Sequence, residues 1–380
     1  MRPGTASGTG TDLRTPPNGR AAISFSSAQG PLPASVRERA RALFDGVGRP
    51  CAAEEPFNAA PFQAVLGELE SDLRALLAIP STHRVLFAHG GASAQFAAVP
   101  LNLGRPDRRA EYLLAGYWSQ KALVEALRFT PAWGASLLQG LDEAGTWPLA
   151  AHADRSTRSN VAYTHLVSNE TADGLQLRSL PDSWPVPLVA DMSSDFLTRA
   201  IDVRSFGIVY ASAQKSLGVP GFAVVVLDEK LLGAAGANCP AILDYGALAK
   251  SGSRVNTPST LSLRIAAMMT RWLREQGGVA AAEQETRRRS ALLYSAIDAP
   301  GGFYRCPAPR ALRSCVTVCF RLPSPALDEE FLAWSEDQGL FNLRGHSAVG
   351  GIRAALYPAL PPGASESLAQ LMTEFHRTKG

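Results

Sequence analysis

Apolar positions along the chain follow two spacings, one typical of amphipathic helices and one typical of short buried strands. Helical spacing over residues 61–77 places a set of apolar side chains on one face: Phe62, Val65, Leu66, Leu69, Leu73 and Leu76. Short apolar runs without strict alternation stand at 85–87, 111–115, 162–167, 187–190, 207–211 and 223–227. Such runs are typical of strands that helices cover on both faces. The pattern therefore predicts an α/β fold with a mixed, mostly parallel sheet flanked by helices.

Beyond about residue 297 the pattern changes from long helices to a mixture of helices and strands. Further helices are predicted at 35–44, 92–101, 261–275, 280–297, 328–339 and 362–377, and strands at 313–321 and 350–356. We predict a large domain over 33–283 and a small C-terminal domain over 284–380. Residues 1–20, rich in Gly, Thr, Pro and Arg, read as a disordered tail. Residues 21–32 are expected to form an arm that packs with the small domain.

Composition narrows the classes of protein further. The 380 residues are 46% hydrophobic and 19% charged, as in ordinary globular domains. Basic and acidic residues nearly balance, and the net charge of +3 does not argue for a nucleic-acid partner. No apolar run is long enough for a membrane span. The five cysteines form no CxxC pair, and we expect no metal site. The N-terminus has no apolar segment of the signal-peptide kind, so a cytoplasmic location is expected.

Two side chains at predicted strand ends suggest a cofactor. Asp191 follows the apolar strand 186–190, and Lys215 follows the small residues that end the strand at 207–211. Pyridoxal phosphate needs a lysine for its Schiff base and an acid that keeps its pyridine nitrogen protonated. The turn Gly90-Gly91-Ala92-Ser93 lies between a strand and a helix, where backbone amides attract phosphate. Each signal alone is weak, because strand-end aspartates often cap helices and most lysines are solvated.

Dispersed motifs make the case stronger. The chain from about residue 23 to its C-terminus resembles the phosphoserine aminotransferases, a branch of the class V, fold-type I pyridoxal-phosphate enzymes. The matching stretches are VLFAHGGASAQFAAVPLNL (85–103), AGYWSQKA (115–122), SNETADG (168–174), PLVADMSSDFLTRAIDV (187–203), FGIVYASAQKSLGVPG (206–221), NTPSTL (256–261), FYRCP (303–307) and GHSAVGGIRAALYPALP (345–361). The resemblance implies a large cofactor-binding domain and a small C-terminal domain.

The resemblance also implies roles for individual residues. Lys215 is similar to the Schiff-base lysine, Asp191 to the partner of the pyridine nitrogen, and Trp118 to the tryptophan that stacks on the cofactor ring. Arg353 matches the arginine that binds the substrate α-carboxylate, a role that suits a guanidinium. The other cofactor contacts implied are Ala92 and Ser93 at the phosphate, Thr171 and Gln214 in the same subunit, and Asn256 and Thr257 toward the neighbouring subunit. A homodimer with shared active sites follows from the last two.

The departures from the family lie in the segments that would face the substrate. The family binds the substrate's distal anionic group with two His-Arg pairs, and in this chain Phe57 and Asn58 stand at one pair, His346 and Ser347 at the other. The N-terminal turn is altered after Ser27 as well. Loss of two cationic donors disfavours a phosphate monoester, since hydrogen bonds to charged groups contribute roughly 1.5–3 kcal/mol each. Compensation by arginines at 49, 254 or 344 stays open.

We therefore predict a pyridoxal-phosphate-dependent aminotransferase that acts on an amino acid and a 2-oxo acid without phosphate, in specialised biosynthesis. One alternative is a genuine phosphoserine transaminase that uses 3-phosphooxypyruvate and glutamate in serine biosynthesis. A second is other chemistry on the same cofactor, such as elimination, decarboxylation or replacement. A third is a non-enzymatic binding module, against which the retained Lys215 and Asp191 argue.

Overall fold

The computed structural model describes residues 22–46, 50–138, 160–178 and 184–380. The predicted disordered tail over 1–20 lies outside the described residues. Within the described part of the chain, no helix is long and apolar enough to cross a bilayer. No group of three or more His, Cys, Asp or Glu side chains in that part is arranged to hold a metal ion.

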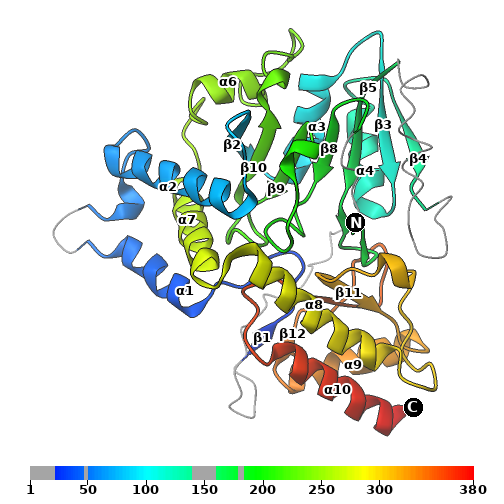
Figure 1. The fold of residues 1–380 in the computed structure, drawn as a ribbon. Helices are drawn as coiled ribbons and strands as arrows, with labels where there is room; N and C mark the ends of the chain where they lie inside the picture. Colours follow the sequence, from blue (N-terminus) through cyan, green and yellow to red (C-terminus); the bar gives the residue numbers. More distant parts are fainter. Residues whose placement is uncertain (1–21, 47–49, 139–159, 179–183) are drawn as a thin grey trace, which may run out of the picture.

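A seven-stranded sheet forms the centre of the larger part of the molecule, with strand order β2-β10-β9-β8-β5-β3-β4 (Figure 1). β10 runs antiparallel to β2 and β9, whereas all other neighbours are parallel. The mixed, mostly parallel α/β sheet predicted from the apolar runs is therefore confirmed. Its strands are β2 (His83–Gly90), β3 (Arg109–Leu114), β4 (Ala132–Ser136), β5 (Val161–Val167), β8 (Leu188–Asp191), β9 (Ile208–Ser212) and β10 (Gly221–Asp228).

Helices cover the two faces of this sheet. One core lies between the sheet and the helices α2 (Ala60–Leu77) and α7 (Thr260–Glu275), and includes Phe62, Leu263 and Val224. A second core on the other face joins Phe96 and Val225 with α3 (Ala92–Leu103), α4 (Tyr117–Ala126) and α6 (Tyr245–Lys250). Because both faces are buried, the strands need no polar alternation, which explains their continuous apolar runs. The helix α1 (Ala34–Arg41) packs on α7.

The C-terminal part has a core of its own. It contains α9 (Pro325–Asp337), α10 (Ala364–Lys379) and the antiparallel pair β11 (Thr317–Phe320) and β13 (Ile352–Ala355). The helix α8 (Gly278–Ile297) contributes to two of these cores. Ala282 belongs to the first core, between the sheet and α2 and α7, and Leu293 belongs to the C-terminal core. The predicted domain boundary at 283 falls inside this continuous helix. The division into two domains stays a prediction.

The N-terminal arm contacts both the C-terminal core and the chain that follows β9 of the large sheet. β1 (Ile23–Ser24) pairs in parallel with β12 (Leu340–Phe341), and Phe25 is fully buried in the C-terminal core. The arm then passes against the backbone at Lys215, where the Gly30 amide donates to the Gln214 carbonyl oxygen over 2.8 Å. A Cβ at Gly30 would lie 2.2 Å from the Lys215 carbonyl oxygen, so only glycine fits this approach.

Several sequence-based boundaries were wrong. The predicted strand at 313–321 is reduced to β11, because the Ser314 hydroxyl accepts from the Val316 and Thr317 amides and turns the chain there. α3 ends at Leu103, two residues beyond the predicted end at 101, and the Leu103 side chain is buried. The elements α4, α6, β1, β4 and β12 were not predicted, nor was the short hairpin of β6 (Asn169–Glu170) and β7 (Leu175–Gln176).

Candidate active site

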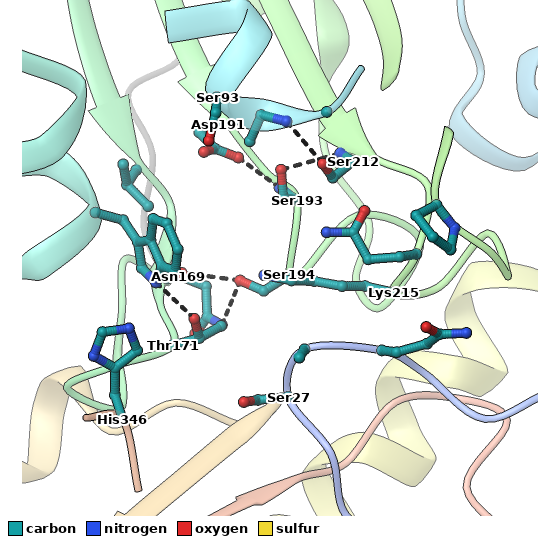
Figure 2. A pocket seen from close by; sticks show the side chains of 18 of the residues that line it. Ser27, Ser93, Asn169, Thr171, Asp191, Ser193, Ser194, Ser212, Lys215 and His346 are labelled. Atoms are coloured by element: carbon teal, nitrogen blue, oxygen red, sulfur yellow. Dashed lines mark hydrogen bonds between the residues drawn. The ribbon is translucent and has the colours of Figure 1, made fainter. Parts of the chain in front are cut away.

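A cavity of about 690 Å³ opens at the carboxyl ends of β5, β8 and β9. Its walls come from these strand ends, the α3 and α4 N-termini, the N-terminal arm and the C-terminal part of the chain (Figure 2). This edge of a parallel sheet is where α/β folds bind ligands. The lining residues are Ser27, Ala28, Gln29, Gly90, Gly91, Ala92, Ser93, Trp118, Val167, Asn169, Thr171, Asp191, Ser193, Ser194, Ser212, Gln214, Lys215, Pro220, Gly221, His346 and Arg353.

The predicted acid and amine both line this cavity. Asp191 ends β8 and is buried, and its Oδ1 accepts from the Ser193 amide over 2.8 Å. Burial raises the pKa of the Asp191 carboxyl above its ordinary value. Burial lowers the pKa of the Lys215 amine to about 8; the Asp191 charge opposes this shift and the Arg353 charge adds to it. The structure thus brings together an amine that titrates near neutrality and a buried acid.

Trp118 is held at the start of α4 by the hairpin that follows β5. Its indole Nε1 donates to the Thr171 Oγ1 over 2.9 Å. The Glu170 carboxylate accepts from the amides of Trp118 and Ser119, each over 2.8 Å, and so caps the N-terminus of α4. Burial raises the pKa of Glu170 to about 7, although these hydrogen bonds oppose the shift. The aromatic ring is therefore fixed at both its indole and its backbone.

Arg353 comes from β13 in the C-terminal part of the chain. Its Nη1 donates to the Thr171 carbonyl oxygen over 3.1 Å. Burial lowers the pKa of Arg353, yet a guanidinium remains protonated in proteins. Thr171 thus holds the tryptophan through its side chain and the arginine through its backbone. A carboxylate that enters the cavity meets a positioned planar cation.

The phosphate end expected at Ala92 and Ser93 also lies in the cavity. α3 begins directly after Gly91, and the Ala92 amide donates to the Ser212 Oγ over 2.8 Å. The Ser212 amide in turn donates to the Ser193 Oγ over 3.0 Å. Sequence reasoning missed both serines. The only available signal was their place at strand ends beside Asp191 and Lys215.

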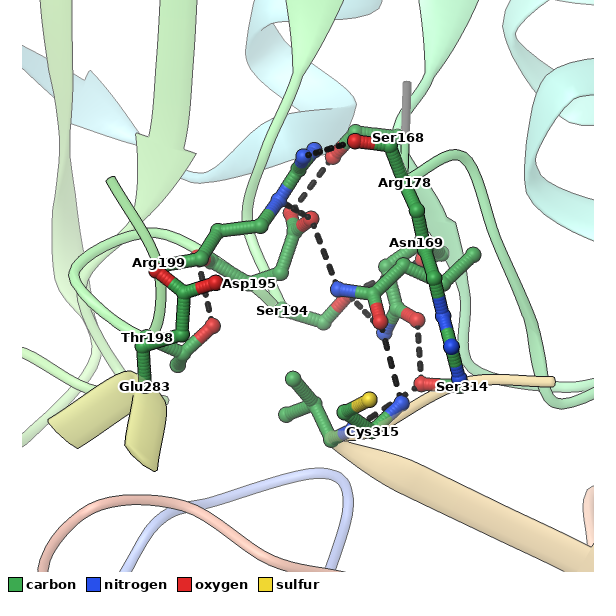
Figure 3. A network of polar contacts seen from close by, with 12 residues as sticks. Ser168, Asn169, Arg178, Ser194, Asp195, Thr198, Arg199, Glu283, Ser314 and Cys315 are labelled. Carbon is green, nitrogen blue, oxygen red and sulfur yellow. Dashed lines mark hydrogen bonds and ion pairs between the residues drawn. The ribbon is translucent and has the colours of Figure 1, made fainter. Parts of the chain in front are cut away.

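A polar network behind the cavity was missed too. Asn169 lines the cavity, donates to the Ser194 Oγ over 2.8 Å and accepts from the Ser314 hydroxyl over 2.6 Å. Figure 3 shows the network extending to the buried carboxylate of Asp195, which pairs with Arg199 over 3.0 Å. The SNETADG motif contains Asn169, but the resemblance implies a role only for its threonine. The network connects the sheet edge with the start of β11.

The residues expected at the distal substrate group are placed differently. His346 lines the cavity, with its ring 4.4 Å from that of Tyr117. Burial and the Arg353 charge lower the pKa of His346. Ser347 and Asn58 are exposed, and Phe57 packs partly buried against the first core. These last three do not line the cavity of the single chain, and their assignment to the substrate pocket stays a prediction.

The segment around Phe57 is tied to its own core. Its neighbour Glu55 forms an ion pair with Arg264 of α7. The Arg264 side chain is only 8% exposed, and its guanidinium carbon lies 5.4 Å from the centre of the Phe62 ring. This anchor points the segment toward α2 and α7. Among the described residues, no cation of this segment lines the cavity.

The arginines suggested as replacements have other contacts. Arg344 is exposed and pairs with Glu329, and Arg254 Nε donates to the Ser251 carbonyl oxygen over 3.2 Å. Neither lines the cavity, and residue 49 lies outside the described part of the chain. Asn256 and Thr257 are exposed ahead of α7 in the single chain. Their expected reach toward a neighbouring subunit stays a prediction.

The residues present fit pyridoxal phosphate on chemical grounds. Lys215 offers an amine, Asp191 a buried acid, Trp118 an aromatic face and α3 an N-terminus whose first amides have no partner within the helix. Arg353 supplies a separate site for a carboxylate. This set provides the two binding sites that the predicted reaction needs, one for the cofactor and one for an amino acid.

Comparison with known proteins agrees with this chemistry. The family profile described as "Aminotransferase class-V" matches residues 25–359. A phosphoserine aminotransferase of Azotobacter vinelandii is 43% identical over 94% of this chain and 99% of its own length. The solved phosphoserine aminotransferase of Bacillus circulans has a TM-score of 0.86 at 37% identity, covering 95% of this chain and 99% of its own.

The cofactor is supported by a further structure. The PLP-bound phosphoserine aminotransferase of Trichomonas vaginalis has a TM-score of 0.82 at 31% identity and covers 93% of this chain and 100% of its own. The fold is thus that of the fold-type I pyridoxal-phosphate enzymes, and the expected cofactor is confirmed. Taken with the cavity geometry, these matches show that the chain belongs to the class V aminotransferase family, in the group of the phosphoserine aminotransferases.

Proposed function

We propose that this pyridoxal-phosphate-dependent transaminase moves an amino group between an amino acid and a 2-oxo acid that carry no phosphate. The observation that carries the proposal is the charge of the cavity. Among the described lining residues, Arg353 is the one guanidinium, and Lys215 and His346 are the other basic groups. The match to the class V aminotransferases favours transamination over elimination, decarboxylation or simple binding.

The cavity residues divide the work of a transaminase. When bound, the cofactor supplies a protonated ring that takes up the electron pair released as the substrate Cα loses its proton. Asp191 faces the ring nitrogen in this proposal and keeps its proton in place. Lys215, with a pKa of about 8, is suited to take the Cα proton and return it near neutral pH. Arg353 binds the α-carboxylate in a fixed orientation.

The distal end of the substrate then meets few charges. Lys215 and Arg353 are already committed, and the lowered pKa of His346 leaves this ring mostly neutral at pH 7. Two missing charge-assisted hydrogen bonds, at roughly 1.5–3 kcal/mol each, reduce affinity for a phosphate monoester by about two to four orders of magnitude. The proposed substrate therefore has a neutral side chain. The same argument disfavours the distal carboxylate of glutamate.

A genuine phosphoserine transaminase is the second candidate. The relatives at 42–43% identity bear that name, and in this candidate a neighbouring subunit supplies the missing cations. A homodimer with shared sites is part of this candidate and of the first. Exposed Asn256 and Thr257 support it. Within this chain, Lys121 is a further cation close to Trp118, with its Nζ 5.2 Å from the centre of the ring. Lys121 itself does not line the cavity.

A substrate panel separates the two candidates. The holoenzyme is mixed with single amino acids, including phosphoserine and glutamate, and loss of the bound cofactor's visible absorbance is followed. We expect kcat/KM for phosphoserine and glutamate to be at least 100-fold below that for the best neutral amino acid. If phosphoserine is the best donor, the first candidate is wrong and the second stands.

A gain-of-function variant provides an independent test. S347R introduces a guanidinium beside His346, and S347A serves as the matched control. We expect S347R to raise kcat/KM for phosphoserine by about tenfold or more, since one charge-assisted hydrogen bond contributes that much. S347A should leave it unchanged. Equal values for both variants would show that the distal group of the substrate lies elsewhere.

A further inference from the structure

A serine hydroxyl lies against the N-terminus of α3, at the corner of the cavity where the phosphate is expected. Ser212 ends β9 and is 3% exposed, and its Oγ accepts from the Ala92 amide over 2.8 Å (Figure 2). A hydroxyl carries one hydrogen besides its acceptor lone pairs. Since Ser212 also lines the cavity, that hydrogen can reach a group bound there.

The neighbouring backbone is shaped around this hydroxyl. A Cβ at Gly91 would lie 2.6 Å from the Ser212 Oγ, so the glycine permits the close approach of strand end and helix start. The first amides of α3 have no partner within their own helix, and the helix dipole favours an anion there. The hydroxyl and the amides of Ala92 and Ser93 therefore share one anion-binding corner.

Ser212 is also connected to the opposite end of the cofactor site. Its amide donates to the Ser193 Oγ over 3.0 Å, and the Ser193 amide donates to the Asp191 Oδ1 over 2.8 Å. A continuous path of hydrogen bonds thus runs from the acid to the start of α3, and Figure 2 shows it along one wall of the cavity. The path fixes how far the acid lies from the anion-binding corner.

We propose that Ser212 is a ligand of the cofactor phosphate. Its Oγ hydrogen donates to a phosphate oxygen while the Oγ continues to accept from the Ala92 amide. The Ala92 amide already donates to Ser212. The Ser212 hydroxyl therefore takes the place of this amide as a hydrogen-bond donor to the phosphate. This inference rests on the proposed cofactor site but not on the identity of the substrate.

The test measures binding of the cofactor with and without its phosphate. Apo-protein is titrated with pyridoxal phosphate and with pyridoxal, and the ratio of the two Kd values is compared between the wild type and S212A. We expect S212A to raise the Kd of pyridoxal phosphate at least tenfold, equivalent to about 1.4 kcal/mol. The Kd of pyridoxal should change less than twofold. S216A removes a buried hydroxyl that has no partner among the described residues, and should leave both constants unchanged.

An unchanged Kd for pyridoxal phosphate in S212A would overturn the proposal. Equal weakening of both ligands would overturn it as well, because Ser212 would then act only through Asp191 or Lys215. The pair S212T and S212V covers the case in which S212A does not fold, since threonine and valine share a shape and differ in the hydroxyl. S212T should keep the preference for the phosphorylated ligand and S212V should lose it. No amino-acid substrate is used, so an error about the substrate leaves this result intact.

Discussion

The titration of Lys215 makes a sharp prediction about how fast the apo-protein captures its cofactor. Only a neutral amine attacks the aldehyde. With a pKa of about 8, roughly one-tenth of Lys215 is neutral at pH 7, against about 0.03% for an ordinary lysine. Burial is the main cause, because it penalises the ammonium form. Capture at pH 7 should therefore be about 300-fold faster than an exposed lysine would allow.

The pH profile of this capture is directly measurable. The rate of formation of the visible chromophore is followed by stopped flow after apo-protein is mixed with pyridoxal phosphate. The rate should rise about ninefold between pH 6 and pH 7, and by less than about 1.2-fold between pH 9 and pH 10, since the amine is already neutral above its pKa. R353M removes a charge that lowers the Lys215 pKa, so the break should move upward. K215A, the control, should form no chromophore.

A different profile would refute this reasoning. An amine with the ordinary pKa would show a rise of about eightfold between pH 9 and pH 10. Such a rise would mean that Lys215 is solvated in the apo-protein. A break that moves downward in R353M would show that the Arg353 charge does not lower the Lys215 pKa.

Three further predictions concern single side chains. R353K should lower kcat/KM at least 100-fold with unchanged cofactor affinity, because an ammonium cannot form the bidentate contact; lost cofactor affinity would contradict the assigned role. W118A should raise the Kd of pyridoxal phosphate about tenfold, whereas W118F, which keeps an aromatic face but loses the bond to Thr171, should retain most of the affinity in the same titration. R264M should destabilise the fold by roughly 3 kcal/mol in urea unfolding, because Glu55 loses its partner. R271M, which breaks an exposed pair with Glu68, should change stability by less than about 1 kcal/mol.

The parts of the fold that sequence predicted are those where burial alone decides. α2 and α7 each bury one face, so their apolar spacing indicates a helix, and the inner strands are apolar because both faces are covered. β4 escaped prediction because it lies at the sheet edge and is only partly buried. The antiparallel direction of β10 depends on the connection before it, which carries no periodic signal.

The site divides in the same way. Lys215 and Asp191 were predicted because an amine and an acid after two apolar strands together suit pyridoxal phosphate, and because the family resemblance assigns a role to both. Ser193 and Ser212 carry no such signal, since serines at strand ends are common in turns. Their importance comes from contacts between strands that are neighbours in space, β8 and β9, and from the start of α3. Distances of this kind need the folded chain.

The N-terminal arm has a consequence for how the protein is handled. It joins β12 of the C-terminal core through β1 and then lies on the backbone of Lys215 through Gly30, so one short peptide clasps both cores and closes one side of the cavity. Proteolysis within residues 23–30 would release both contacts at once. Because bound cofactor holds Lys215 from the other side, holoenzyme should resist this cleavage longer than apo-protein. The fraction of chains with an uncleaved arm would then report how much of the protein has cofactor bound.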